Sequence, residues 1–136
     1  MADKKLKVNI IAPNQVLYSG EADLVNVPGV LSPFEVLYNH APIVSGLERG
    51  IIKISDKKDG TKRFVSSAGF IEVLNNNVSI LVEKAIDEGN LKADDLNKNI
   101  DILKQKLSKL EEGESDIAVL KSEIEFEEFC KKVISK

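Results

Sequence analysis

The sequence predicts an antiparallel β-sandwich or flattened barrel followed by an antiparallel α-helical hairpin. The first observation is that all four prolines and six of the eight glycines lie before Ile86, between short apolar runs that recur about every ten residues. Regular short strands joined by turns are typical of an all-β sandwich or barrel. The second observation is that the chain after Leu91 has no proline, one glycine, and apolar residues at helical spacing.

These two textures divide the 136 residues into two parts, which we place at residues 1–86 and 87–136. The length allows one domain with an appendage, since a domain usually contains roughly 100–200 residues. The first part carries 10 Lys and Arg against 9 Asp and Glu, and the second carries 9 against 13. Neither part has the basic stripe typical of nucleic-acid-binding proteins, so no nucleic-acid partner is expected.

The strands of the first part are predicted from alternating apolar and polar residues. Leu6 to Ile10 alternates strictly, and the run continues to Ala12 before Pro13, which cannot donate a ladder hydrogen bond. Similar runs predict strands at residues 15–19, 22–27, 43–47, 51–55, 63–66, 70–74 and 78–82, with a further apolar stretch at residues 36–38. About eight to ten short strands with no room for a crossover helix favour antiparallel pairing.

Glycine and asparagine mark the turns between these strands. Asp59-Gly60 predicts a hairpin turn because both residues tolerate positive φ, and Asn75-Asn76-Asn77 predicts a second hairpin of the same construction. Ser19-Gly20-Glu21 is expected to form a turn between the second and third strands.

One apolar stripe predicts a helix from about Asp94 to Glu111. Its members follow one another at spacings of 4, 3, 4 and 3 residues: Leu96, Ile100, Leu103, Leu107 and Leu110. A second helix is expected from about Ile117, with Leu120 and Ile124 on its stripe, after a link in which Gly113 caps the first helix. Because the link has only about five residues, the helices are expected to be antiparallel.

This hairpin is expected to be only marginally stable by itself. Two helices of about five turns that share one narrow seam bury little apolar surface, whereas ordering ~40 residues has a large entropy cost. The seam therefore needs a third surface, either on the β part or on another protein. Two alternative docking surfaces would make the hairpin a switch element.

The residue chemistry predicts no catalytic, metal or cofactor site. His40, the only histidine, is interpreted as a structural or interface residue, because no serine, cysteine or acid pattern accompanies it. Cys130 lies among apolar residues of the second helix and is expected to be a packing thiol. One His and one Cys cannot form a tetrahedral zinc site, and no glycine-rich phosphate loop occurs. A binding or structural subunit is therefore expected.

No segment is predicted to insert into a membrane or to direct secretion. Lys7, Asn9 and Pro13 interrupt any apolar run behind the N-terminal lysines, and no stretch approaches the ~20 apolar residues of a membrane helix. If the protein works at a membrane, a partner must hold it there.

Three segments occur in a specific order. Val25-Asn26-Val27-Pro28-Gly29 is followed eleven residues on by His40-Ala41-Pro42, and later by Ser67-Ala68-Gly69-Phe70-Ile71-Glu72-Val73. With the terminal helix pair, this order strongly resembles the epsilon subunit of bacterial and chloroplast rotary ATP synthases, equivalent to the mitochondrial delta subunit. The resemblance covers essentially the whole chain, and the pairing of the last two segments is more specific than either alone.

The resemblance implies a ten-stranded flattened antiparallel β-sandwich with a C-terminal helical hairpin, in a noncatalytic subunit of the proton-translocating ATP synthase. The subunit would be peripheral, at the cytoplasmic face of the cell membrane. Its sandwich would bind the gamma subunit with one face and the c-ring with its lower end, coupling ring rotation to the central stalk. By position, the resemblance implies a gamma interface at His40, Ala41, Pro42 and Ser45, and a c-ring interface at Ser32, Pro33, Phe34 and Tyr38.

Two departures from the family pattern change these implications. The usual Gly-Glu-x-Gly is here Ser32-Pro33-Phe34-Glu35, so Phe34 or Tyr38 is expected to contact the ring through apolar groups in place of an acidic salt bridge. Some family members bind ATP at Ile-Asp-x-x-Arg-Ala, which opens the first helix. That motif is not matched at Leu91, Lys92 and Asp95, so this subunit is expected not to bind ATP.

The resemblance also implies a regulatory role for the helical hairpin. In many family members it either folds against the sandwich or extends along gamma toward the alpha and beta subunits, where it blocks ATP hydrolysis. Residues 116–136 here contain four Lys against five acidic residues, whereas inhibitory hairpins usually offer basic residues to an acidic loop of beta. Only partial inhibition is therefore expected.

The alternative hypothesis is a free-standing regulatory β-domain that oligomerises through its helical hairpin. Light scattering separates the two hypotheses, because a rotor subunit is expected to be a monomer when isolated. An enzyme is the third hypothesis, and it has no candidate nucleophile or acid-base pair.

Overall fold

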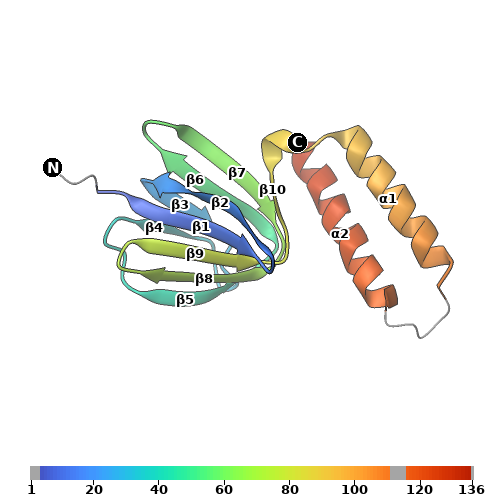
Figure 1. Cartoon of the computed structure of the whole chain (residues 1–136), viewed down its shortest axis with the longest axis horizontal. Helices are drawn as coiled ribbons and strands as arrows, with labels where there is room; N and C mark the ends of the chain where they lie inside the picture. The colour runs from blue at the N-terminus through green and yellow to red at the C-terminus, as the bar shows by residue number, and fades with distance from the viewer. Residues whose placement is uncertain (1–3, 111–115, 136) are drawn as a thin grey trace. The chain divides into compact units, whose positions relative to one another are not determined.

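The computed structural model describes residues 4–110 and 116–135, and the chain divides into two compact units at Gly89 and Asn90. The first unit consists of β-strands, and a short 3-10 helix, Glu88–Asn90, begins where this unit ends. The second unit is a pair of helices (Figure 1). The predicted fold class, a ten-stranded sandwich followed by a helical hairpin, is confirmed.

Two five-stranded sheets form the sandwich. Sheet A has the order β2-β1-β9-β8-β5, from Gln15–Ala22, Leu6–Ala12, Asn77–Val82, Gly69–Leu74 and Ile43–Leu47. Sheet B has the order β10-β7-β6-β3-β4, from Ala85–Asp87, Gly60–Ser66, Gly50–Asp56, Leu24–Val27 and Phe34–Leu37. The short β10 was not predicted, because its three residues are too few to display a period.

The core lies between the inner faces of the two sheets. Alternate residues of each strand point inward, as period two requires, and most of these are β-branched or leucine. The fully buried members include Leu6, Val8, Ile10, Val25, Val36, Ile52, Ile71, Val78 and Ile80. Because alternate residues are packed in this core, the residues between them point outward from the two sheets.

One strand pair departs from the predicted antiparallel arrangement. β1 and β9 are parallel neighbours in the centre of sheet A, with Lys7 opposite Asn77 and Ile11 opposite Leu81. Parallel strands need a long connection, and here the rest of the sandwich supplies it. The sequence could not indicate this pair because alternation shows which residues face inward without showing which strands are neighbours.

The predicted turn at Ser19-Gly20-Glu21 is wrong. All three residues lie within β2, which pairs with β1 through a register shift between Ile10 and Ile11. Gly20 is needed for a different reason: a Cβ there would stand 2.7 Å from Oη of Tyr18, whose ring contacts Phe64 edge to face at 5.4 Å. The glycine therefore makes room for an aromatic contact between the sheets.

The two predicted hairpin turns are confirmed, with a difference in detail. Asn75 and Asn76 both have positive φ, at 48° and 65°, as a type I′ turn between β8 and β9 requires. In the β6–β7 hairpin only Gly60 has positive φ, at 84°, so the left-handed position is the glycine and not Asp59.

The second unit contains α1 at Ala93–Ser108 and α2 at Asp116–Ile134. The first helix ends at Ser108, before the predicted end at Glu111, and the Gly113 cap lies outside the described residues. Leu96, Ile100 and Ile124 of the predicted seam are buried, and the other five seam residues are half-buried: Leu103, Leu107, Leu110, Ile117 and Leu120. The most enclosed side chains of α2 are Phe126 and Cys130. Neither described helix is long and apolar enough to cross a membrane.

Candidate partner-binding surfaces

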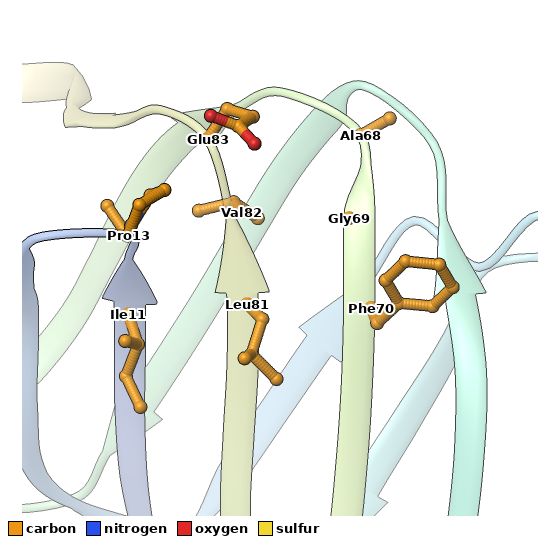
Figure 2. A pocket seen from close by; sticks show the side chains of 9 residues that line it. Ile11, Pro13, Ala68, Gly69, Phe70, Leu81, Val82 and Glu83 are labelled. Atoms are coloured by element: carbon orange, nitrogen blue, oxygen red, sulfur yellow. The ribbon is translucent and has the colours of Figure 1, made fainter.

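The outer face of sheet A carries a row of apolar side chains that crosses the strands. Ile11 on β1 is opposite both Val16 on β2 and Leu81 on β9, and Leu81 is opposite Phe70 on β8. Val16, Phe70 and Leu81 are 60%, 61% and 47% exposed. Figure 2 shows Ile11, Leu81 and Phe70 on three neighbouring strands.

Val30, in the connection between β3 and β4, extends this row beyond Phe70. Gly46 on β5 is opposite Phe70 and has no side chain, but Val30 of the β3–β4 connection stands over it, 3.4 Å from the position of an added Cβ. Val30 is half exposed. We call Val16, Ile11, Leu81, Phe70 and Val30 the apolar row; it spans five strands, or about 19 Å at the usual strand spacing.

A hollow of about 420 Å³ lies beside the apolar row, at the end of sheet A where β1 and β9 finish and β8 begins. Figure 2 shows Pro13, Val82 and Ala68 around this end, with the carboxylate of Glu83 at the rim. We call this the Pro13 end. The hollow is lined mainly by apolar groups, which is typical of a surface that receives a partner's side chain.

A second hollow, of about 320 Å³, lies on sheet A at the opposite end, and its lining includes Pro42, Val44, Glu72 and Leu74. The turn beside it is held by Asn39 and Asn76: Asn39 N donates to Asn76 Oδ1 at 2.6 Å, and Asn76 Nδ2 donates to Asn39 Oδ1 at 3.3 Å. We call this the Asn76 end. Asn39 has φ of 65°, a conformation that asparagine tolerates better than most residues.

An exposed apolar face on a rigid sandwich indicates a binding protein, and comparison with known proteins shows which kind. Residues 5–88 match the family described as "ATP synthase, Delta/Epsilon chain, beta-sandwich domain". The chain belongs to this ATP synthase delta/epsilon family. The resemblance indicated by the sequence is thereby confirmed.

Relatives named ATP synthase epsilon chain support the assignment along most of the chain. That of Hyphomonas neptunium is 32% identical over 126 residues, covering 93% of each chain. That of Leptospira interrogans is 43% identical over 94 residues, covering 69% of this chain and 70% of the relative. This member of the delta/epsilon family is a noncatalytic subunit of an ATP synthase, which is a membrane-associated complex.

Solved structures share the fold at low sequence identity. A chain in the Euglena gracilis mitochondrial ATP synthase structure has a TM-score of 0.65 at 16% identity, covering 92% of this chain and 77% of that one. A chain in the Tetrahymena thermophila mitochondrial ATP synthase central stalk and c-ring structure has a TM-score of 0.54 at 18% identity, covering 92% and 95%.

The four residues expected at the gamma interface of this delta/epsilon chain do not all present side chains to one surface. Pro42 lines the second hollow, next to exposed Ala41 and half-buried His40. His40 is held locally: its backbone N donates to Leu37 O at 3.0 Å, and its Nδ1 lies 2.6 Å from Ala41 O. These two contacts hold the backbone and the ring of His40 within the turn.

Ser45 is on the inner side of β5. It is opposite buried Ile71, it is half-buried, and its Oγ donates to Gly46 O at 3.2 Å. Its neighbour Val44 is 72% exposed and lines the second hollow. The alternation of β5 therefore presents Val44 on the outer face in place of Ser45.

The four residues expected at the ring are likewise separated. Ser32 and Pro33 are exposed in the β3–β4 connection, whereas Phe34 packs against the sandwich core. Tyr38 follows the far end of β4, five residues after Pro33 and so about 16 Å away along a strand. These four residues do not form one surface. The sequence could not show that they lie apart, because it does not determine the path of the chain between positions 32 and 38.

A charged cluster ties three segments together at the Asn76 end. Lys5 Nζ contacts Asp23 Oδ1 at 2.9 Å and also pairs with Asp56, while Asp23 Oδ2 accepts from Lys57 N at 2.6 Å. The hydrogen bonds from Lys5 are the main reason that the pKa of each carboxyl lies below its usual value. They also raise the pKa of Lys5 above its usual range. The cluster clamps the start of β1 to the β2–β3 bend and the end of β6.

An ion pair fixes the chain where it leaves the sandwich. Arg63 Nε on β7 donates to Glu88 Oε2 at 2.6 Å, one residue beyond the last pair of β7 and β10. Gly89 N donates to Asp87 Oδ1 at 2.9 Å. The sequence does not indicate this pair, because its members lie 25 positions apart.

Lys92 is the N-cap of α1 but its side chain makes no capping hydrogen bond, and Asp95 is exposed. Among residues 4–110 and 116–135, no group of three His, Cys, Asp or Glu is placed to hold a metal ion.

Proposed function

We propose that this subunit works in the central stalk of the ATP synthase, where it binds the gamma subunit with the outer face of sheet A and the c-ring with its Pro13 end. The observation that carries the proposal is the apolar row. It is a contiguous exposed apolar surface on a charged protein. The next outward-facing residues of β1, β9 and β8 are polar: Asn9, Ser79 and Glu72. An apolar centre with a polar border is the usual anatomy of a protein interface.

The second hollow and its turn extend this interface toward the Asn76 end. Pro42 lines it, directly after His40 and Ala41 in the chain, and Val44 supplies the outward side chain expected from Ser45. The Asn39 and Asn76 amide pair keeps the turn in one conformation, so little ordering entropy is lost on binding.

The proposed ring contact is the β3–β4 connection, in which Ser32 and Pro33 are exposed. This connection belongs to the Pro13 end, because Gly29 forms a bridge with Leu47, which is opposite Gly69 at the start of β8. A sandwich that is bound by gamma on one face and by the ring at one end transmits torque, because its close-packed core does not deform. The subunit is then peripheral, at the cytoplasmic face of the cell membrane, and the complex holds it there.

The gamma contact is tested by placing a charge in the apolar row. Leu81→Asp should weaken binding to the purified cognate gamma subunit by about tenfold or more, since a carboxylate would be desolvated at the interface. Leu37→Asp is the matched control, because Leu37 is a similarly exposed leucine, 53%, on the outer side of β4 in the other sheet. Isothermal titration calorimetry measures both. Equal affinities for the two variants would contradict the assignment of the face.

The helical hairpin is proposed to modulate ATP hydrolysis by reaching toward gamma and the alpha and beta subunits. The half-buried state of five of its eight seam residues, and the exposure of Ile102 and Val119 at 51% and 56%, support a second docking surface. The charge balance of residues 116–136, four Lys against five acids, argues for partial inhibition.

Removal of residues 90–136 tests this role. The cut leaves Glu88 in place with its Arg63 partner, so the sandwich unit keeps its boundary contact. Hydrolysis by the reconstituted complex should rise by about twofold to fivefold, a partial effect worth less than about 1 kcal/mol. An unchanged rate would rule out the regulatory role while leaving the coupling role intact.

The isolated subunit is proposed to be a monomer that does not bind ATP. The mismatches at Leu91, Lys92 and Asp95 support the second statement. Light scattering coupled to gel filtration should give one mass near 15.0 kDa. A stable oligomer would favour the alternative, a free-standing regulatory domain that associates through its hairpin.

A further inference from the structure

The connection from β4 to β5 crosses from sheet B to sheet A through residues 38–42. It begins with a tight turn, in which His40 N donates to Leu37 O at 3.0 Å. Asn39, the third residue of this turn, has φ of 65°, and a positive φ at that position is what a type II turn requires. The turn determines the local path of the chain, but it does not determine where the connection lies against the sandwich.

The side chain of Asn76 binds this connection to sheet A. Asn39 N donates to Asn76 Oδ1 at 2.6 Å, and Asn76 Nδ2 donates to Asn39 Oδ1 at 3.3 Å. Because a backbone N–H can only donate, the first bond identifies the oxygen of the Asn76 amide and leaves Nδ2 for the second. Among the described residues, these are the two hydrogen bonds that join residues 38–42 to a distant part of the chain.

Asn76 is itself held in place by sheet A. It is half-buried in the turn between β8 and β9, with φ of 65°, and its backbone O accepts from Lys7 N on β1 at 2.9 Å. The strands β1, β9 and β8 are consecutive neighbours in sheet A. The amide pair therefore joins the connection to a position that three strands hold.

The connection carries part of the proposed gamma interface, whereas Asn76 does not. Ala41 and Pro42 are exposed, and Pro42 lines the second hollow. The lining residues that come from β8 end at Leu74, two positions before Asn76. Asn76 would therefore affect a partner in this hollow through the residues of the connection.

We propose that Asn76 is a positioning residue of the gamma interface, which acts through Asn39 to hold residues 40–42 in the binding conformation before gamma arrives. This inference rests on the proposed function, which places gamma on the outer face of sheet A. Without the amide pair the connection would occupy other positions, and the apparent affinity would fall with the fraction of molecules in the binding conformation. Because bound gamma would then hold the connection, the loss should appear in the association rate constant.

Surface plasmon resonance of the full-length chain on immobilised cognate gamma subunit tests the proposal. Asn76→Gly removes the amide and keeps a residue that tolerates positive φ. It should lower the association rate constant by about fivefold to tenfold and leave the dissociation rate constant within about twofold. Asn75→Gly is the matched control and should bind normally, because Asn75 is the other residue of the same turn, with φ of 48° and an exposed side chain.

A conservative variant tests the hydrogen bonds themselves. Asn76→Asp keeps an oxygen that accepts from Asn39 N, and a flip of the Asn39 amide lets its Nδ2 donate to the new carboxylate. Aspartate also tolerates positive φ better than most residues. This variant should therefore associate with gamma within about twofold of the original rate.

Hydrogen exchange in the free subunit, measured by NMR, separates positioning from a loss of overall stability. The Asn39 amide should exchange about tenfold faster in Asn76→Gly than in Asn75→Gly, because it donates the shorter bond of the pair. The increase should be confined to residues 38–42. Faster exchange throughout the sandwich would overturn the inference, because Asn76 would then act on global stability.

The binding results distinguish failure of this inference from failure of the proposed function. Normal association of Asn76→Gly, or equal losses in the two glycine variants, would overturn the inference alone, since Leu81→Asp tests the gamma face separately. A loss confined to the dissociation rate constant would overturn it too, because Asn76 would then act within the complex. If the unaltered chain fails to bind gamma, the proposed function fails and the inference fails with it. Thermal melting of each variant verifies that the sandwich remains folded.

Discussion

At Gly69 the chain passes so close to the neighbouring strand that a side chain does not fit. A Cβ there would stand 2.0 Å from Leu81 O and 2.8 Å from Val82 Cγ1. The glycine of the Ser67-Ala68-Gly69 segment, which helped to indicate the family, thus has a packing reason. The position also lines the hollow beside the apolar row.

Gly69→Ala should therefore destabilise the sandwich by roughly 2–3 kcal/mol, because the clash is with backbone and the strands must separate. Urea denaturation followed by circular dichroism measures the change. Gly60→Asn is the control: Gly60 has no atom within 4 Å of an added Cβ, and asparagine tolerates its positive φ. Similar losses in both variants would contradict the packing argument.

The ion pairs of Lys5 with Asp23 and Asp56 make a pH-dependent contribution to the stability of the folded protein. The pKa values of Asp23 and Asp56 are lowered from 3.8 in the folded protein, mainly by their hydrogen bonds with Lys5. The stability they provide is therefore fully present above their ordinary pKa and is lost as pH falls through the lowered folded values. The cluster therefore stabilises the folded protein at neutral pH and ceases to do so in strong acid.

Lys5→Met should lower the melting temperature at pH 7, because two carboxylates would then face each other without a cation. The difference from the original protein should shrink as pH falls below about 4, where the carboxyls become protonated. Differential scanning calorimetry across pH 2–7 measures it, with exposed Lys4→Met as the control. A pH-independent difference would show that the charge of Lys5 is not the cause.

At the scale of the element, β10 is the strand that the sequence did not predict, and it joins the sandwich to the second unit. Its three residues pair with β7 at the edge of sheet B, so among the described strands it has a single neighbour. The Arg63 and Glu88 pair adds one contact just beyond the strand. Their side chains are 47% and 29% exposed, which limits the pair to about 0.5 kcal/mol.

Arg63→Gln should accordingly leave the global stability nearly unchanged while increasing the hydrogen-exchange rate of the β10 amides by about twofold. Lys53→Gln serves for comparison, because Lys53 lies opposite Arg63 on β6 and carries the same charge. Exchange measured by mass spectrometry or NMR should separate the two. Equal exchange in both variants would remove the ion pair from the account of this junction.

In the whole molecule, the two units differ in how much buried apolar surface stabilises them. The sandwich encloses a continuous core, whereas the helices share a seam whose members are mostly half-buried. A chain of residues 1–89 should fold and unfold cooperatively alone. A peptide of residues 90–136 should show low helicity that rises with a helix-promoting solvent, since its buried surface barely offsets the entropy of ordering.

Circular dichroism and proton NMR of the two separate pieces would test this asymmetry. Dispersed amide resonances are expected for residues 1–89 and narrow dispersion for residues 90–136. A well-folded isolated hairpin would contradict the weak-core argument and remove the physical reason for treating it as a switch element.

Local sequence patterns were enough to predict which residues face the core and where several turns fall, because these features depend on local period and local backbone preference. Alternation in β1 and the Asn75 and Asn76 turn were predictable in this way. The order of three motifs also sufficed to indicate the family. The hydrophobic seam of the helices followed from the spacing of leucines.

The identity of neighbouring strands, and of the side chains that meet on the surface, became visible in the folded structure and not before. The parallel pair of β1 and β9 brings Ile11 beside Leu81, although 70 residues separate them in the chain, and this pair creates the centre of the apolar row. Closure of two sheets around one core selects such pairs, and no local period records them. The same closure packs Phe34 against the core and places Tyr38 beyond the other end of β4, which is why the residues expected at the ring do not form one surface.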